Sequence, residues 1–83
     1  MNTKRRTLFA FAGVRWAALA TVGERSIGLH VWPDGTHSIE EWYSSNEHNR
    51  TEIHNGNNNY AENFGRWLYL VDLARNAELE AAL

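Results

Sequence analysis

The feature that most constrains this chain is a five-residue turn, Trp32-Pro33-Asp34-Gly35-Thr36, between two segments in which apolar and polar residues alternate. Proline presets φ at the second turn position, aspartate suits the third, and glycine takes the left-handed position that follows. Residues 26–32 and 37–43 are therefore predicted to form an antiparallel hairpin. A second turn at Gly23-Glu24, with glycine where a positive φ is needed, adds residues 14–22 as a third strand of a β-meander.

The two turns fix a register that sorts the side chains by face. Residue 22 is expected opposite 25, residue 18 opposite 29 and residue 16 opposite 31 in the first hairpin, with Leu29 opposite Ile39 in the second. Alternation assigns eight residues to the core face: Trp16, Ala18, Ala20, Val22, Ile27, Leu29, Val31 and Ile39. The opposite face receives Arg15, Ala17, Leu19, Gly28, His30, Trp32, Ser38, Glu40 and Trp42. That face is too aromatic for a plain solvated surface and too polar for a second core.

Two segments that flank the meander are less regular. Residues 7–13 are predicted to form a further strand, with a short helix as the alternative, so the meander has three or four strands. Residues 44–59 contain one large apolar residue, Ile53, and six asparagines. This composition predicts a long polar loop, with a short strand at residues 50–54 as the alternative.

The C-terminal segment has the pattern of an amphipathic helix. Asn59 and Glu62 form a capping box, and the spacing of Tyr60, Phe64, Trp67, Val71 and Ala74 predicts a helix over residues 60–81. Gly65 is expected to mark a close crossing over the sheet. The sequence therefore predicts an α+β fold of two layers, in which one long C-terminal helix packs on one face of the antiparallel meander. Residues 1–83 form a single domain, with a basic arm at residues 1–6.

Composition and charge exclude several classes of protein. The chain of 83 residues has no cysteine, which removes disulfide frameworks, thiolate metal sites and cysteine nucleophiles. Its net charge of −2 argues against a surface built wholly for nucleic acid. The first 25 residues nevertheless carry five basic residues against one acid. No apolar run is long enough to span a bilayer, and Arg15 interrupts the apolar stretch after Lys4-Arg5-Arg6, so we expect a cytoplasmic protein with no membrane partner.

No catalytic motif with a defined spacing is present. Phosphate-binding glycine loops, nucleophile elbows and zinc motifs are all missing from the sequence. Residues 47–55 hold two histidines and two glutamates, and a loop rich in His and Asn before a helix is similar to the ββα-metal nucleases, although the predicted helix here carries no histidine. Metal-dependent nuclease-like activity is accordingly the third hypothesis. We expect that the protein is not an enzyme and that it binds no metal and no cofactor.

The tryptophan content points instead to binding. Four tryptophans occur in 83 residues, and Trp, Tyr and Arg are the side chains that anchor protein–protein interfaces. We therefore predict a small non-enzymatic module that recognises another protein through the aromatic sheet face and the polar loop. The predicted protein-binding residues are Trp32, Trp42, His30, Arg15, Glu40, His48 and Arg50. Self-association through this face is one form of the hypothesis.

Two other interpretations of the same face stay open. Bases could stack on its aromatic side chains while the basic arm holds phosphate, which would make the protein a nucleic-acid-binding module. Alternatively, Trp32 and Trp42 are covered by the N-terminal segment or by residues 44–59 and serve the fold.

In size, lack of cysteine and predicted architecture, the chain resembles the small inhibitor proteins that phages and mobile elements encode against host defence systems, such as anti-CRISPR proteins. The resemblance implies an inhibitor that acts by binding a host complex. It assigns no role to any single residue.

Overall fold

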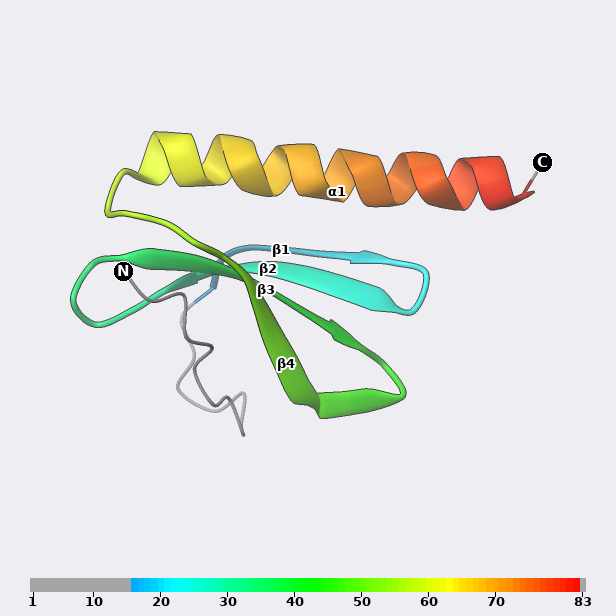
Figure 1. The fold of residues 1–83 in the computed structure, drawn as a ribbon, viewed down its shortest axis with the longest axis horizontal. Helices are drawn as coiled ribbons and strands as arrows, with labels where there is room; N and C mark the ends of the chain where they lie inside the picture. The colour runs from blue at the N-terminus through cyan, green and yellow to red at the C-terminus, as the bar shows by residue number, and fades with distance from the viewer. Residues whose placement is uncertain (1–15, 83) are drawn as a thin grey trace.

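The computed structural model describes residues 16–82, apart from the side chains of residues 47 and 48, as a four-stranded sheet and one helix. The elements are β1 (Trp16–Val22), β2 (Arg25–Val31), β3 (His37–Tyr43), β4 (Asn46–Asn55) and α1 (Tyr60–Ala82). The sheet is antiparallel with strand order β1-β2-β3-β4, and α1 lies along one of its faces (Figure 1). The predicted two-layer α+β fold is confirmed. The strand predicted at residues 7–13 and the basic arm at residues 1–6 lie outside the described residues.

Both predicted turns form. Gly23 has a φ of 62° and Gly35 a φ of 89°, and within the described range no residue other than glycine has a positive φ. Because the φ of Glu24 is negative, the first turn is of the predicted type II′. In the second turn, the Gly35 N–H donates to the Trp32 carbonyl at 2.9 Å, and the Trp32 N–H donates to the Thr36 carbonyl at 2.8 Å.

The predicted register is correct except at Trp16. Ala18 pairs with Leu29, and Leu29 pairs with Ile39, as the turns require. A β-bulge between Trp16 and Ala18 then places Trp16 opposite His30 instead of residue 31. Because a bulge adds one residue to a strand, it moves Trp16 from the core face to the face opposite α1, so its predicted core position is wrong.

The polar loop predicted at residues 44–59 is also wrong, because Asn46–Asn55 forms the edge strand β4; the alternative, a strand at residues 50–54, is correct but too short. Two residues, Ser44 and Ser45, connect it to β3. The strand is held by contacts that polar composition does not reveal, since Arg50 and Glu52 are buried and Ile53 packs against the apolar core.

The core lies between the sheet and α1. Ile27, Leu29, Ile39 and Val71 are completely buried, and the Trp67 indole N–H donates to the Ile27 carbonyl at 2.9 Å. Tryptophan can occupy this interface because its one polar group is satisfied by a backbone acceptor.

The contacts of α1 locate its crossing over the sheet. The crossing occurs at Trp67, Val71 and Ala74, whereas Gly65 is exposed, with open space where a Cβ would stand, so the crossing predicted at Gly65 is wrong. Within residues 16–82, no helix combines the length and the apolar character needed to cross a membrane.

The predicted cap starts the helix. The Asn59 side-chain oxygen accepts the Glu62 N–H at 3.1 Å. In a full capping box, the Glu62 carboxylate would accept the Asn59 N–H. Here the Asn57 side chain accepts the Asn59 N–H at 2.7 Å and donates to the Glu62 carboxylate at 3.0 Å. Asn63, which is 1% exposed, donates to the Asn57 carbonyl at 2.9 Å and anchors the connection from β4.

Candidate functional site

The sheet brings five of the seven predicted binding residues together on the face opposite α1. These residues are His30, Trp32, Glu40, Trp42 and Arg50, and we call them with Ser38 the polar cluster. They come from β2, β3, β4 and the turn after β2. Of the other two predicted residues, Arg15 lies outside the described residues, and His48 lies in β4 but its side chain is not described.

The Glu40 carboxylate is the centre of this cluster. Its Oε2 atom lies 2.5 Å from His30 Nδ1 and accepts a hydrogen bond from Ser38 Oγ at 3.0 Å. A hydrogen bond therefore joins the His30 imidazole to the Glu40 carboxylate. The Trp32 indole N–H donates to Ser38 Oγ at 2.8 Å, so a chain of hydrogen bonds runs from Trp32 to Glu40.

Arg50 brings a positive charge to the same carboxylate. Its guanidinium lies 3.4 Å from Glu40 Oε1, and both side chains are at most 2% exposed. Burial lowers the pKa of the Arg50 guanidinium, while the negative charge of Glu40 acts in the opposite direction. A guanidinium stays charged in proteins, so Arg50 neutralises a carboxylate that could not be buried alone.

Trp16 contributes to this face, although its alternation with Ala18 and Ala20 predicts a core position. Its ring centroid lies 5.2 Å from that of Trp42 and 5.5 Å from that of His30, and the Arg50 guanidinium carbon lies 5.5 Å from its centroid. A Cβ built on Gly28 would lie 2.4 Å from the indole, so the missing side chain of Gly28 leaves the room that Trp16 occupies. No sequence signal marks the bulge that turns Trp16 to this face.

The geometry of the polar cluster fits a structural role, in which its side chains link β2, β3 and β4, better than a catalytic one. The Ser38 hydroxyl donates to Glu40 and not to His30, so it is not activated as a nucleophile by a histidine base. His30, Glu40, Trp42 and Arg50 are each less than 8% exposed, and Trp32 is half-buried. In the folded chain, most of the predicted binding residues therefore contact one another and are not available to a partner. Within the described part of the chain, no group of three His, Asp or Glu side chains is placed to hold a metal ion.

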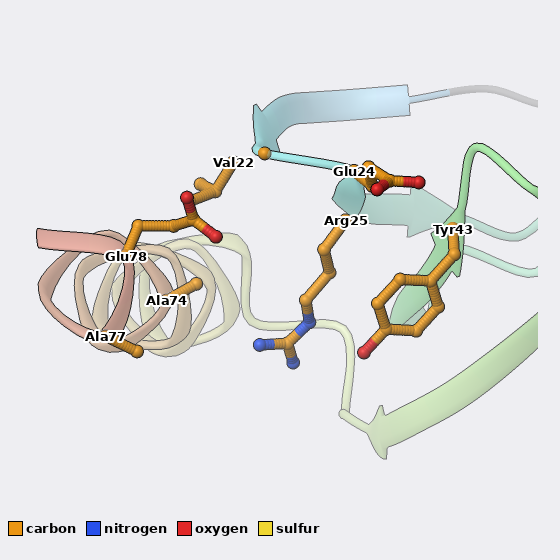
Figure 2. Close-up of a pocket in the computed structure, with 8 residues that line it drawn as sticks. Val22, Glu24, Arg25, Tyr43, Ala74, Ala77 and Glu78 are labelled. Atoms are coloured by element: carbon orange, nitrogen blue, oxygen red, sulfur yellow. The ribbon is translucent and has the colours of Figure 1, made fainter. Parts of the chain in front are cut away.

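A groove opens on the other side of the sheet, beside the C-terminal half of α1. It has a volume of about 530 Å³ and is lined by Val22, Gly23, Glu24, Arg25, Tyr43, Ala74, Ala77 and Glu78. Figure 2 shows Arg25 extending into the space between the helix and the Tyr43 ring. Arg25 Nε lies 2.6 Å from Glu41 Oε1, and this ion pair fixes its direction. No sequence pattern marks these residues, because the groove exists only where α1 passes the hairpin end.

Exposed apolar side chains gather on α1. The large hydrophobic residues that are exposed within residues 16–82 are Leu19, Tyr43, Tyr60, Leu68, Tyr69, Leu73 and Leu79. Five of these seven lie on α1. Tyr69, Leu73 and Ala77 are spaced by four residues and form one ridge that leads into the groove.

Comparisons with protein-family models, with curated proteins and with solved structures find no match to this chain.

Proposed function

We propose that the protein is a binding module whose partner is another protein, and that it recognises this partner through the groove and the adjoining ridge of α1. We call this area the groove surface and define it by Arg25, Tyr43, Tyr69, Leu73 and Ala77. The observation that carries the proposal is the exposure of three large side chains: Tyr43, which lines the groove, is 49% exposed, and Tyr69 and Leu73, on the ridge that ends at the groove residue Ala77, are 60% and 48% exposed. Tyrosine and arginine around a depression are typical of the anchors of protein interfaces.

The charge of the groove indicates the kind of partner segment. Arg25 is already paired with Glu41, whereas the carboxylates of Glu24 and Glu78 stand at the rim. The groove therefore presents net negative charge beside apolar surface. A partner segment with a basic residue next to apolar residues would complement both features.

The protein-binding role is the one that the sequence predicts, but its proposed site is the groove surface and not the sheet face that carries the polar cluster. The polar cluster is buried, so it supports the fold of the sheet, and only Trp32 among its aromatic side chains is partly accessible. An inhibitor of a host complex, which the resemblance in size and architecture implies, would act through such a surface by occupying a site on the complex.

Affinity capture from the native host tests the proposal. Wild-type bait should retain a protein in lysates treated with nuclease as well as in untreated lysates. The variants Tyr43→Ser and Leu73→Ser should lose it, while the matched control Leu68→Ser, on the opposite flank of α1, should keep it. Capture that disappears after nuclease treatment would favour the nucleic-acid alternative, and that complex should also weaken steeply with salt.

A further inference from the structure

A second surface of α1 is complementary to itself. Residues on the flank away from the groove are spaced alternately by three and four positions: Gly65, Leu68, Asp72, Arg75, Leu79 and Ala82. We call them the flank stripe. Leu68 lies about 180° around the helix from Ala77, which lines the groove, because successive residues are about 100° apart. All six residues are exposed.

The order of residues along the flank stripe matches an antiparallel copy of itself. About a two-fold axis midway between Asp72 and Arg75, each residue meets a complementary one. Asp72 meets Arg75 of the second copy, Leu68 meets Leu79, and Gly65 meets Ala82. The two-fold symmetry forms every one of these pairs twice. Small residues at both ends allow the helices to approach closely.

The charged pair at the centre is free to form these contacts. Neither Asp72 nor Arg75 has an ion-pair partner within residues 16–82. The apolar pair is available as well, since Leu68 is 41% exposed and Leu79 is 65% exposed. Spacing by three and four residues is the spacing of side chains in the seam between two packed helices.

The outer face of α1, opposite the buried Val71, does not share this property. Its equivalent row is Glu62, Arg66, Tyr69, Leu73, Asn76 and Glu80. Pairing this row about its own midpoint would set Glu62 against Glu80 of the second copy, and like charges repel. The sequence of α1 therefore favours the flank stripe over the outer face of the helix for contact with a second copy.

The end of α1 gives an independent reason for a partner on this helix. Its last buried residue is Ala74, and residues 75–82 are all exposed. Figure 1 shows the C-terminal end of the helix extending past the turn between β1 and β2. Beyond Ala74 the helix lies against the sheet only near the Gly23 turn, where Glu78 approaches it. Isolated helical turns are marginal in water, so a helix end with few tertiary contacts is stabilised when another helix packs on it.

We propose that two copies of this chain form a symmetric dimer through antiparallel packing of their α1 helices along the flank stripe. The helices overlap over residues 65–82, about 27 Å at 1.5 Å per residue. Ala77, which lines the groove of each copy, lies on the side of α1 away from the interface. The dimer thus offers two identical sites for the partner of the proposed function, but it forms without that partner.

Sedimentation equilibrium of the full chain over a range of concentrations provides the first test. The 9.5 kDa chain should approach twice that mass as the concentration rises. Leu68→Glu and Leu79→Glu should give monomers, whereas the matched control Leu73→Glu, on the groove side, should keep the dimer. A wild-type chain that stays monomeric throughout, or a dimer that Leu73→Glu breaks and Leu68→Glu does not, would overturn the proposal.

Charge exchange tests the pairing itself. Asp72→Arg sets Arg against Arg75 of the second copy, and Arg75→Asp sets Asp against Asp72, so each variant alone should dissociate on the order of tenfold more readily or worse. Mixing the two variants should restore a dimer, which is then a heterodimer, because every central pair again joins opposite charges. Circular dichroism of each variant should retain the wild-type helix signal, which separates lost association from lost folding. A mixture that stays as monomeric as its components would contradict the proposed register.

Discussion

Glu40 is the residue whose burial most needs compensation. Its side chain is completely buried, and it relies on His30, Ser38 and the guanidinium of Arg50 for its partners. A pair of buried charges contributes little to the stability of the fold, because the cost of desolvating both ions offsets most of their attraction. Removing one member is different, since the other is left buried without its counter-charge.

The substitution Glu40→Gln keeps the size of the side chain and removes its charge. We expect it to lower the free energy of unfolding by about 3 to 5 kcal/mol, the usual cost of breaking a buried ion pair. Urea denaturation of the purified variant measures this change. The matched control is Glu41→Gln, whose partner Arg25 is 31% exposed, and there the loss should be about 1 kcal/mol or less. Equal losses for the two variants would show that Glu40 is not an essential part of the cluster.

Gly28 and Trp16 form a second pair that can be tested at the level of single residues. Because a Cβ on Gly28 would lie 2.4 Å from the Trp16 ring, Gly28→Ala should cost about 1 to 3 kcal/mol of unfolding free energy. The effect should change sign in a Trp16→Ala background. There the clash is gone, and alanine stabilises a strand relative to glycine by up to about 1 kcal/mol.

A double-mutant cycle measured by urea denaturation gives both values for Gly28→Ala. If the cost of this substitution is the same with and without Trp16, the indole does not lie over Gly28.

Among the elements, the two hairpins β1-β2 and β2-β3 could be predicted because their turns contain residues with strong conformational preferences. Glycine at positions 23 and 35 and proline at position 33 leave few alternatives for the backbone, and register then follows from alternation. Strand β4 could not be predicted in the same way. Its residues have low strand propensity, and it is held by long-range contacts, such as that of Arg50 with Glu40.

The bulge in β1 shows the same limit. It moves one side chain, Trp16, across the sheet, and the reason lies in the space above Gly28 on the neighbouring strand. Local sequence fixes turns, but it does not report what the next strand leaves empty. The faces of the middle strands were therefore predicted correctly, whereas the burial of Trp42 was predicted only as the alternative to an exposed binding face.

His54 couples β4 to the helix through charge. Burial and the positive charge of Arg66 lower the pKa of His54 below its ordinary value of 6.5, against the opposing effects of Glu62 and Glu52. The unfolded chain therefore binds a proton at His54 more readily than the folded chain. The stability linked to His54 is fully present above about pH 6.5 and is lost as the pH falls through the lowered value.

We expect the melting temperature to decrease as the pH is lowered from about 8 to about 5. The decrease should be smaller in the variant His54→Gln. Thermal unfolding followed by circular dichroism measures both. The variant Arg66→Gln should also reduce the fall, because it removes one of the two causes of the shift. Identical pH dependence in all three proteins would exclude His54 as a source.

For the whole molecule, the two sides of the sheet have different roles. The side that carries α1 holds the apolar core, and the opposite side holds buried charges that join β2, β3 and β4. Sequence alternation predicted this division of residues. It could not predict that most of the exposed large apolar side chains within residues 16–82 lie on α1, because a helical pattern shows which residues face a sheet but not how far the sheet extends beneath the helix.

The length of α1 beyond the sheet leads to a prediction that separates folding from association. Deleting residues 79–83 removes Leu79 and Ala82 from the flank stripe but no buried residue of α1. At concentrations at which the chain is monomeric, the free energy of unfolding should change by no more than about 1 kcal/mol, because an exposed helix end contributes little. The same deletion should abolish the dimer. Urea denaturation at low concentration and sedimentation equilibrium at high concentration measure the two effects on one variant. A shortened chain that unfolds would show that the helix end is required by the monomer, and one that still dimerises would show that the copies meet elsewhere.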